Sequence, residues 1–426
     1  MRGIGITARN GGNGMELKPR PMYLDKLLAL RDNGLIKVIT GMRRCGKSSL
    51  LALLEQRLTQ DGVDREHIIA INLEEFEYAD YDAERLHRHI AERLGKGGGN
   101  YILLDEVQLV DGWERAVNAL RVEADADIYL TGSNAHLLSS QLSTLLSGRY
   151  VQIGVFPLTY SEFLDYTGQA SSGEAFTRYT TYGGLPPVVD QGTNQALART
   201  VLSGIYDTIF VRDIAQHLQI RNPLVFNDVA RYLADVAGSP VSVTKIEHRL
   251  KSARRPTANE TIERYISGLM DAFLFYRAQR INVRGGDYLQ GLSKYYPSDP
   301  GIRNMLLGFP GGDFGPLLEN VVHNELRVRG YSIQVGKMDD LEIDFVATRL
   351  RDDMSVERMF IQVSASILDK GTREREFAPF ARLAGVPGRR MILTLDTFGL
   401  GTTDGVEVVN ALDWLTSGNE ASRGAD

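Results

Sequence analysis

The sequence is poor in cysteine, since Cys45 is the only one among 426 residues. A disulfide within the chain and a zinc site made of several cysteines are therefore both excluded. Long apolar runs are missing too, and none approaches the roughly 20 residues that a membrane-spanning helix needs. The first 14 residues, MRGIGITARNGGNG, contain no apolar stretch of the kind that a secretory signal has. These absences predict a cytoplasmic protein that makes no membrane contact.

Positive charge is not in excess either, because the formal net charge is −6 at pH 7. A protein that bound nucleic acid over much of its surface would carry the opposite sign, so only a local basic patch could serve that purpose. The length exceeds that of one ordinary domain, and several domains are expected. We expect residues 1–20 to be a disordered, glycine-rich leader. Met15 within it is an alternative start, which would leave residues 1–14 out of the native protein.

The strongest motif is GMRRCGKSS at residues 41–49, which fits the pattern G-x-x-x-x-G-K-[ST]. It follows LIKVIT, a run typical of a buried strand, and precedes SLLALLEQRL, whose apolar residues have helical spacing. Strand, glycine loop and helix in this order bind phosphate, because backbone N–H groups and the helix N-terminus face the anion. A chance turn is the alternative. The predicted nucleotide-binding loop consists of Gly41, Arg44, Cys45, Gly46, Lys47, Ser48 and Ser49.

Four side chains have expected roles in phosphoryl transfer. Lys47 would reach the β- and γ-phosphates of ATP, and the Ser48 hydroxyl would be a ligand of Mg²⁺. The second half of such a site is an acidic strand end, which NYILLDEVQ at 100–108 supplies. Asp105 would hold Mg²⁺ through water, and Glu106 would polarise the attacking water. The expected cofactors are therefore ATP and Mg²⁺, with ADP as the product.

A third strand is expected over ADIYLTGSN at 126–134, and a fourth within IIAINLEEFEY at 68–78. Ligands of open α/β sheets bind at the carboxyl ends of the parallel strands, so Asn134 or Ser133 is a candidate contact to the γ-phosphate or the attacking water. A simple asparagine turn is the alternative. Because strands alternate with helical stretches over this region, the sequence predicts an α/β fold with a parallel sheet.

These segments together resemble a group of AAA-type P-loop ATPases of bacteria and archaea that carry a C-terminal domain of unknown function. The resemblance extends to YGGLPPVV at 182–189, KYYPSDPGIRN at 294–304 and LLENVVHNELRVRGY at 317–331. It implies an ATPase core over residues 21–156 and a helical lid over 157–220. It further implies a winged-helix-like region over 221–300 and a restriction-endonuclease-like α/β domain over 301–426. The group has no settled biological role.

The resemblance also marks Arg149, which lies in the phrase SGRY after the third strand. A cationic group there would stabilise the charge that develops during phosphoryl transfer, either in its own subunit or in a neighbouring one. The second case requires a homo-oligomer. A salt bridge within the lid is the structural alternative.

The winged-helix-like region contains a local basic segment, HRLKSARR, just before the helix that would read DNA. Basic groups in that position grip phosphates. Glu260 and Glu263 near the helix start oppose base contacts, and winged helices also serve as packing modules. The candidate DNA contacts are Arg249, Lys251, Arg254 and Arg255.

The C-terminal region resembles a restriction-type nuclease that has lost part of its site. Such enzymes hold Mg²⁺ with carboxylates and stabilise the attacking hydroxide with a lysine. Glu319 and Asp344 stand where the first carboxylates are expected, but Gln362 replaces an acid and Ser364 replaces the lysine. An amide weakens metal binding and a serine carries no charge. We therefore expect a nuclease-like fold without nuclease activity, in which Glu319 and Asp344 are structural or bind the end of a peptide or nucleic acid.

Three functions follow from these patterns. The first is an ATPase whose cycle moves the winged-helix-like and nuclease-like domains, and Glu106 favours it because a pure nucleotide binder does not need that acid. The second is a nucleotide-gated switch or scaffold with little turnover, which acts on a protein or DNA partner. The third is an active nuclease, against which Ser364 argues.

Overall fold

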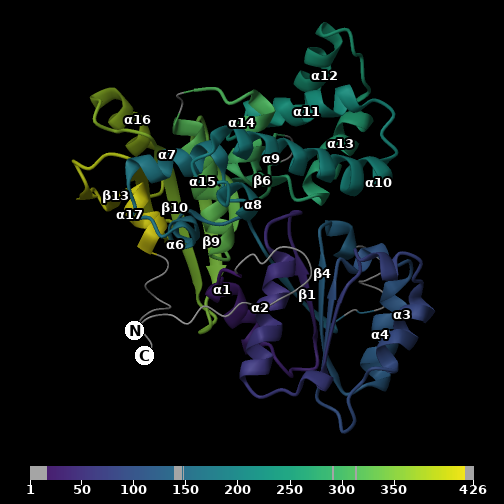
Figure 1. Cartoon of the computed structure of the whole chain (residues 1–426). Helices are drawn as coiled ribbons and strands as arrows, with labels where there is room; N and C mark the ends of the chain where they lie inside the picture. The colour runs from purple at the N-terminus through teal and green to yellow at the C-terminus, as the bar shows by residue number, and fades with distance from the viewer. Residues whose placement is uncertain (1–16, 139–145, 147, 290–291, 312–313, 418–426) are drawn as a thin grey trace. The chain divides into compact units, whose positions relative to one another are not determined.

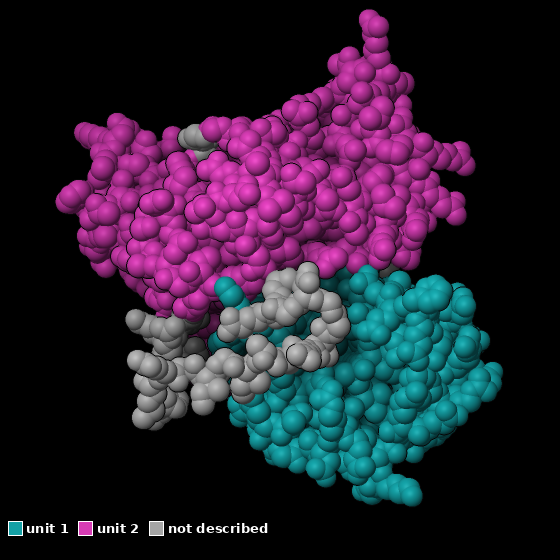
Figure 2. Space-filling view, viewed as in Figure 1, with its two compact units in different colours: residues 1–41, 46–155 teal, residues 42–45, 156–426 magenta. Residues whose placement is uncertain are grey.

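The computed structural model describes residues 17–138, 146, 148–289, 292–311 and 314–417. Most of the expected leader, including Met15, lies outside the described residues, as does Ser147 of the phrase SGRY. The chain forms two compact units, which Figure 2 colours separately. The first contains the residues up to Gly41 and Gly46–Val155, and the second contains Met42–Cys45 and Phe156–Asp426. The change of unit after Val155 lies one residue before the expected end of the ATPase core.

The first unit is built on a five-stranded sheet in the order β2-β3-β4-β1-β5, and every pair in it is parallel. The strands expected from the apolar runs are confirmed. Strand β1 and strand β3 are buried along their whole length, as strands with both faces covered must be. The strands are β1 (Ile36–Thr40), β2 (Ile68–Asn72), β3 (Asn100–Asp105), β4 (Ala126–Gly132) and β5 (Tyr150–Gly154).

Helices cover both faces of this sheet (Figure 1). Helices α1 (Pro21–Ala29) and α2 (Lys47–Gln60) lie on one side, and α3 (Ala83–Ala91) and α4 (Trp113–Glu123) lie on the other. Short 3₁₀ helices occur at Arg65–His67, Phe76–Tyr78, Val107–Leu109 and Ala135–Leu138. This three-layer arrangement agrees with the predicted α/β core.

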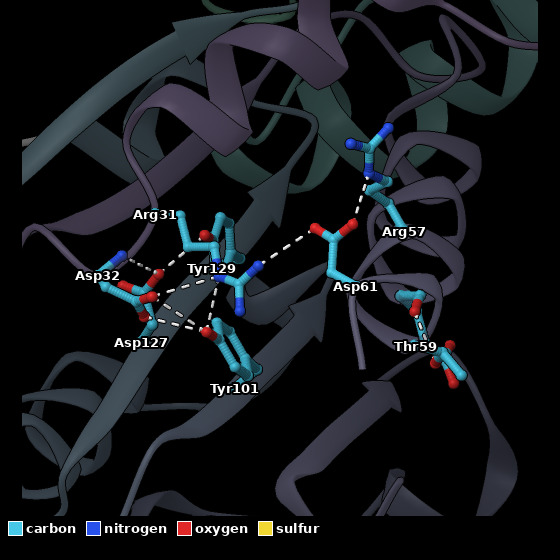
Figure 3. A network of polar contacts seen from close by, with 9 residues as sticks. Arg31, Asp32, Arg57, Thr59, Asp61, Tyr101, Asp127 and Tyr129 are labelled. Atoms are coloured by element: carbon cyan, nitrogen blue, oxygen red, sulfur yellow. Dashed lines mark hydrogen bonds and ion pairs between the residues drawn. The ribbon is translucent and has the colours of Figure 1, made fainter. Parts of the chain in front are cut away.

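A polar network fixes the amino-terminal ends of the strands (Figure 3). Asp127 on β4 forms a buried ion pair with Lys37 on β1, and the Tyr129 hydroxyl donates to Asp127 Oδ2 at 2.8 Å. Arg31 donates to the Tyr101 hydroxyl on β3 at 2.7 Å. Buried charges need such partners, because an unpaired charge in the core is costly. The candidate site lies at the opposite ends of these strands, which are their carboxyl ends.

The second unit begins with a helical region. Its helices are α6 (Tyr160–Thr167), α7 (Gly173–Tyr182), α8 (Pro186–Val189), α9 (Gln195–Thr208), a π-helical stretch η5 (Ile209–Ala215) and α10 (Gln216–Leu218). The region expected to be winged-helix-like contains α11 (Pro223–Asp235), α12 (Val243–Ser252) and α13 (Asn259–Asp271). Helices α14 (Pro300–Leu307), α15 (Phe314–Val328), α16 (Lys370–Ala381) and α17 (Ala411–Thr416) follow.

The motif YGGLPPVV makes a tight turn whose glycines allow close packing. Asp299 accepts hydrogen bonds from Gly184 N at 2.7 Å and from Gly301 N at 2.8 Å at the start of α14. Gly183 has φ +83°, and a Cβ there would lie 1.9 Å from Asp299 Oδ1. The two prolines after the glycines begin the four-residue helix α8, since proline is tolerated in the first turn of a helix.

The second unit also contains an eight-stranded mixed sheet in the order β12-β13-β11-β10-β9-β8-β6-β7. Strands β6 and β7 pair antiparallel, and β6 also pairs parallel with β8. The sheet therefore crosses the domain boundary expected at residue 300. Its strands are β6 (Phe275–Asn282), β7 (Lys294–Pro297), β8 (Ser332–Met338), β9 (Leu341–Leu350), β10 (Val356–Ser364), β11 (Arg389–Thr394), β12 (Gly401–Thr403) and β13 (Val406–Asn410).

None of the helices among the described residues combines the length and the apolar character needed to cross a bilayer.

Candidate functional site

The phosphate-binding loop joins the carboxyl end of β1 to the start of α2. Gly46 adopts φ +105° there, a conformation that favours glycine. Helix α2 begins at Lys47, and no side chain caps the backbone N–H groups of its first turn. Ser48 and Ser49 in this turn are exposed. The helix N-terminus is thus open to an anion, as the sequence pattern predicts.

Lys47 turns its side chain back across the loop. The side chain is 3% exposed, and its ammonium donates to Gly41 O at 3.0 Å and lies 3.7 Å from Glu106 Oε1. The structure therefore brings together the loop lysine and the acid at the end of β3, although 59 positions separate them in the sequence. Phosphates bound at the loop would compete with Glu106 for this ammonium.

Thr131 on β4 ties the two acids to the neighbouring strand. Its hydroxyl donates to Asp105 Oδ1 at 2.5 Å and accepts from Glu106 N at 2.9 Å. Burial raises the pKa of Asp105, while hydrogen bonds from Ser48 and Thr131 oppose that rise. Ser48 and Asp105 thus offer a hydroxyl and a carboxylate side by side, a set of hard oxygen donors that suits Mg²⁺.

Gln108 holds the other end of Glu106. Its Nε2 donates to Glu106 Oε2 at 2.5 Å and lies 3.4 Å from Ser133 Oγ. Glu106 itself has φ +53°, which few non-glycine residues adopt. Gln108 Oε1 is buried and has no hydrogen-bond partner among the described residues. One oxygen of Glu106 is thereby fixed by an amide, and the other faces Lys47.

The four residues at the crest of the loop belong to the second unit. Met42 is buried in the helical core that contains Leu185, and Arg43 Nε lies 3.3 Å from Asp213 Oδ2 on η5. Cys45 is completely buried, whereas the side chain of Arg44 is exposed and its φ is +69°. Cys45 therefore offers a phosphate its backbone rather than its thiol.

Asn134 and Arg149 have different positions relative to the sheet. Asn134 is buried beyond the carboxyl end of β4, on the same edge as Asp105. Arg149 is exposed and directly precedes β5, whose first residue pairs with Ile36 at the start of β1. Four residues of strand, about 13 Å, separate that edge from the loop after Thr40. Arg149 therefore precedes the edge of the sheet opposite to the loop, and its contact with a nucleotide stays a prediction.

The basic segment before α13 is partly neutralised. Arg249 Nη1 lies 3.3 Å from Asp235 Oδ2, and Arg255 forms an ion pair with Asp228. Lys251 and Arg254 are exposed, and no ion pair involves either of them among the described residues. Glu260 and Glu263 are exposed on α13 itself. The segment therefore carries less free positive charge than its sequence indicates.

The nuclease-like residues come together around a lysine that the sequence reasoning missed. Lys294 Nζ on β7 lies 3.3 Å from Glu319 Oε1, 3.4 Å from Asp344 Oδ1 and 3.1 Å from Glu342 Oε1. Burial alone would lower the pKa of Lys294, but the three carboxylates outweigh it and raise that pKa. A lysine in the buried strand KYYP is the signal that could have revealed this cluster, because a buried ammonium needs an acidic partner.

Gln362 and Ser364 take structural positions on β10. Gln362 Oε1 accepts from Asp344 N at 3.3 Å, and Ser364 Oγ donates to Ser366 O at 3.0 Å. Lys370 is exposed and lies 3.8 Å from Glu374. No group of three or more acids, histidines or cysteines with metal-binding geometry occurs in the described part of the chain.

Comparison with known proteins places this site in a recognised domain. The profile of an AAA domain matches residues 33–164, which include all five strands of the first sheet and every residue of the phosphate site. An uncharacterized protein of Haemophilus influenzae is 39% identical over 404 residues, which are 93% of this chain and 98% of that protein. The chain belongs to the family of this protein.

A second profile and more distant proteins also match the chain. A domain of unknown function (DUF8612) matches residues 173–313, so strands β8–β13 lie beyond it. An uncharacterized protein of Methanocaldococcus jannaschii is 26% identical over 364 residues, or 82% of this chain and 78% of that protein. Among solved structures, AMPPCP-bound DnaA from Aquifex aeolicus matches with 15% identity and a TM-score of 0.29 over 58% of this chain and 85% of that chain.

The chain thus carries an AAA domain, and such a domain implies ATP binding and hydrolysis.

Proposed function

We propose that the chain binds ATP with Mg²⁺ at the loop after β1 and hydrolyses it. The observation that carries this proposal is the contact of Lys47 with Glu106 beside Asp105, at the open N-terminus of α2. A loop that only binds phosphate needs the lysine and the helix N-terminus. A carboxylate held next to that lysine adds a group that can take a proton from water.

In the proposed reaction each residue has one task. The backbone of the loop and Lys47 bind the β- and γ-phosphates, and Lys47 leaves Glu106 in doing so. Ser48 and Asp105 would hold Mg²⁺, which supplies positive charge against the phosphate oxygens. Glu106 Oε1, released from Lys47, accepts the proton of the attacking water. Gln108 keeps the other oxygen of Glu106 in place.

Phosphate release by the full-length protein tests the proposal, with Lys47→Ala and Glu106→Gln as variants. Lys47→Ala should bind ATP too weakly to turn it over. Glu106→Gln should bind ATP about as well as the wild type but lower kcat by roughly 10²- to 10⁴-fold. The exposed residues Lys245 and Glu84 provide matched controls as Lys245→Ala and Glu84→Gln, which should leave both quantities unchanged.

Two results would count against hydrolysis. Tight ATP binding without turnover by the wild type would favour the nucleotide-gated switch. Turnover that survives Glu106→Gln would remove Glu106 from the reaction and leave only the binding site.

A further inference from the structure

Two adjoining hollows lie on the eight-stranded sheet of the second unit. One has a volume of about 430 Å³ and the other about 380 Å³, and Tyr288 and Gln334 line both. Strands β6, β8, β9 and β10 follow one another across the sheet at this place. Gln279 pairs with Gln334, and Gln334 pairs with Val346. The two hollows therefore form one continuous groove across neighbouring strands.

The charge of this groove has one sign. Arg277 and Arg327 line the first hollow, and Arg284 and Arg358 line the second. No carboxylate lines either hollow. No ion pair joins any of the four arginines to an acid within the described ranges. We call this feature, made of the four arginines and Tyr288, the arginine groove.

Arg327 is the most constrained of the four. It lies half-buried on α15, its guanidinium is 4.1 Å from the centre of the Tyr276 ring, and its Nε is buried without a hydrogen-bond partner among the described residues. Burial lowers the pKa of Arg327. A guanidinium that is stacked and desolvated but has no carboxylate partner raises the free energy of the unliganded protein. An anionic ligand would offset this desolvation penalty.

The arginine groove differs from the rest of the surface. The chain as a whole has a net charge of −6, and two of the four cations in the segment 249–255 have acidic partners. In the groove, by contrast, Tyr288 has an exposed fraction of 61% and lines both hollows together with the four arginines. Arginines that follow a groove, with an aromatic ring between them, suit a backbone of phosphates whose bases can stack.

We propose that the arginine groove binds single-stranded nucleic acid. The arginines contact successive phosphates, and Tyr288 stacks on a base. This site is separate from the phosphate loop and from the basic segment 249–255, and it does not depend on whether the chain hydrolyses ATP.

Fluorescence anisotropy of a labelled 20-nucleotide single strand with the full-length protein tests this proposal. The double variant Arg277→Gln/Arg358→Gln should raise Kd about 10-fold or more and reduce the salt dependence by roughly 0.7 for each lost phosphate contact. Tyr288→Ala should raise Kd about 5-fold, and Tyr288→Phe should restore affinity because it keeps the ring. Arg277 and Arg358 are exposed, so these variants should fold normally.

The control Arg249→Gln/Arg254→Gln removes the same charge from the other basic segment and should change Kd little. Three results would overturn the proposal. They are no binding at low salt, equal losses in both double variants, and displacement of the strand by polyglutamate as readily as by unlabelled strand. The last would identify an acidic peptide as the occupant. A duplex that bound more tightly than the strand would contradict the role of Tyr288.

Discussion

At the scale of single residues, Thr131 connects both acids of the candidate site, and its hydroxyl can be removed without changing the volume. Thr131→Val takes away the acceptor of Glu106 N and the donor to Asp105 Oδ1. Because small displacements of a reacting group cost up to about 10²-fold in rate, we expect kcat for ATP to fall roughly 10- to 100-fold while KM changes little. Steady-state phosphate release measures both.

The conservative variant separates positioning from packing. Thr131→Ser keeps the hydroxyl and should recover most of kcat, although it loses a methyl group. The hydroxyl also lowers the pKa of Asp105, so Thr131→Val should shift the acid limb of the kcat/KM profile to higher pH. If serine and valine impair kcat equally, Thr131 matters for packing alone.

The residues that meet at the candidate site could be predicted from the sequence only where a local pattern marks them. The pattern GxxxxGK and an acidic end on an apolar strand are local, so Lys47, Asp105 and Glu106 could be named in advance, and the structure brings them together. Gln108 was only a polar residue after a strand. Gln108 contacts Glu106 at a place where Glu106 has a left-handed φ, and no local sequence pattern predicts that backbone conformation.

At the scale of elements, Lys294 joins β7 to α15 and β9 through three carboxylates. Lys294→Met keeps the length of the side chain but leaves the carboxylates without their cation. Removing one partner of a buried ion pair costs about 3–5 kcal/mol, and we expect the free energy of unfolding of the second unit to fall by that amount. Urea unfolding followed by the fluorescence of Trp414, in a Trp113→Phe background, reports this unit alone.

The matched control for this variant is Lys370→Met. Lys370 is 90% exposed and lies 3.8 Å from Glu374 on the surface of α16, so its loss should cost less than about 1 kcal/mol. Equal effects of the two substitutions would mean that Lys294 is not the cation on which the cluster depends.

At the scale of the whole molecule, the two sheets differ in how far the sequence predicts them. The parallel sheet could be predicted because apolar strands alternate with helices in the sequence. Strands in such an alternating pattern pair with one another in a parallel sheet. The mixed sheet pairs β6, which ends at Asn282, with β8, which begins at Ser332, and the expected boundary at residue 300 lies between these two strands. Long-range strand pairing leaves no local mark, so this join could not be predicted from the sequence. The lysine in the buried strand KYYP indicated that an acidic partner was needed, but not which residues supply it.

The carboxylate cluster makes the stability of the second unit depend on pH. Burial and the nearby Asp344 raise the pKa of Glu319 to about 7, against an ordinary value near 4.3 in the unfolded chain. The folded state binds the extra proton between these values, so stability is highest below about pH 4.3 as far as Glu319 is concerned and falls as pH rises to 7. The slope is at most about 1.4 kcal/mol per pH unit. Glu319→Gln should flatten it when urea unfolding is followed through Trp414 at pH 5, 6 and 7.5, again in the Trp113→Phe background. A variant whose slope equals that of the wild type would show that Glu319 is ionised throughout this range.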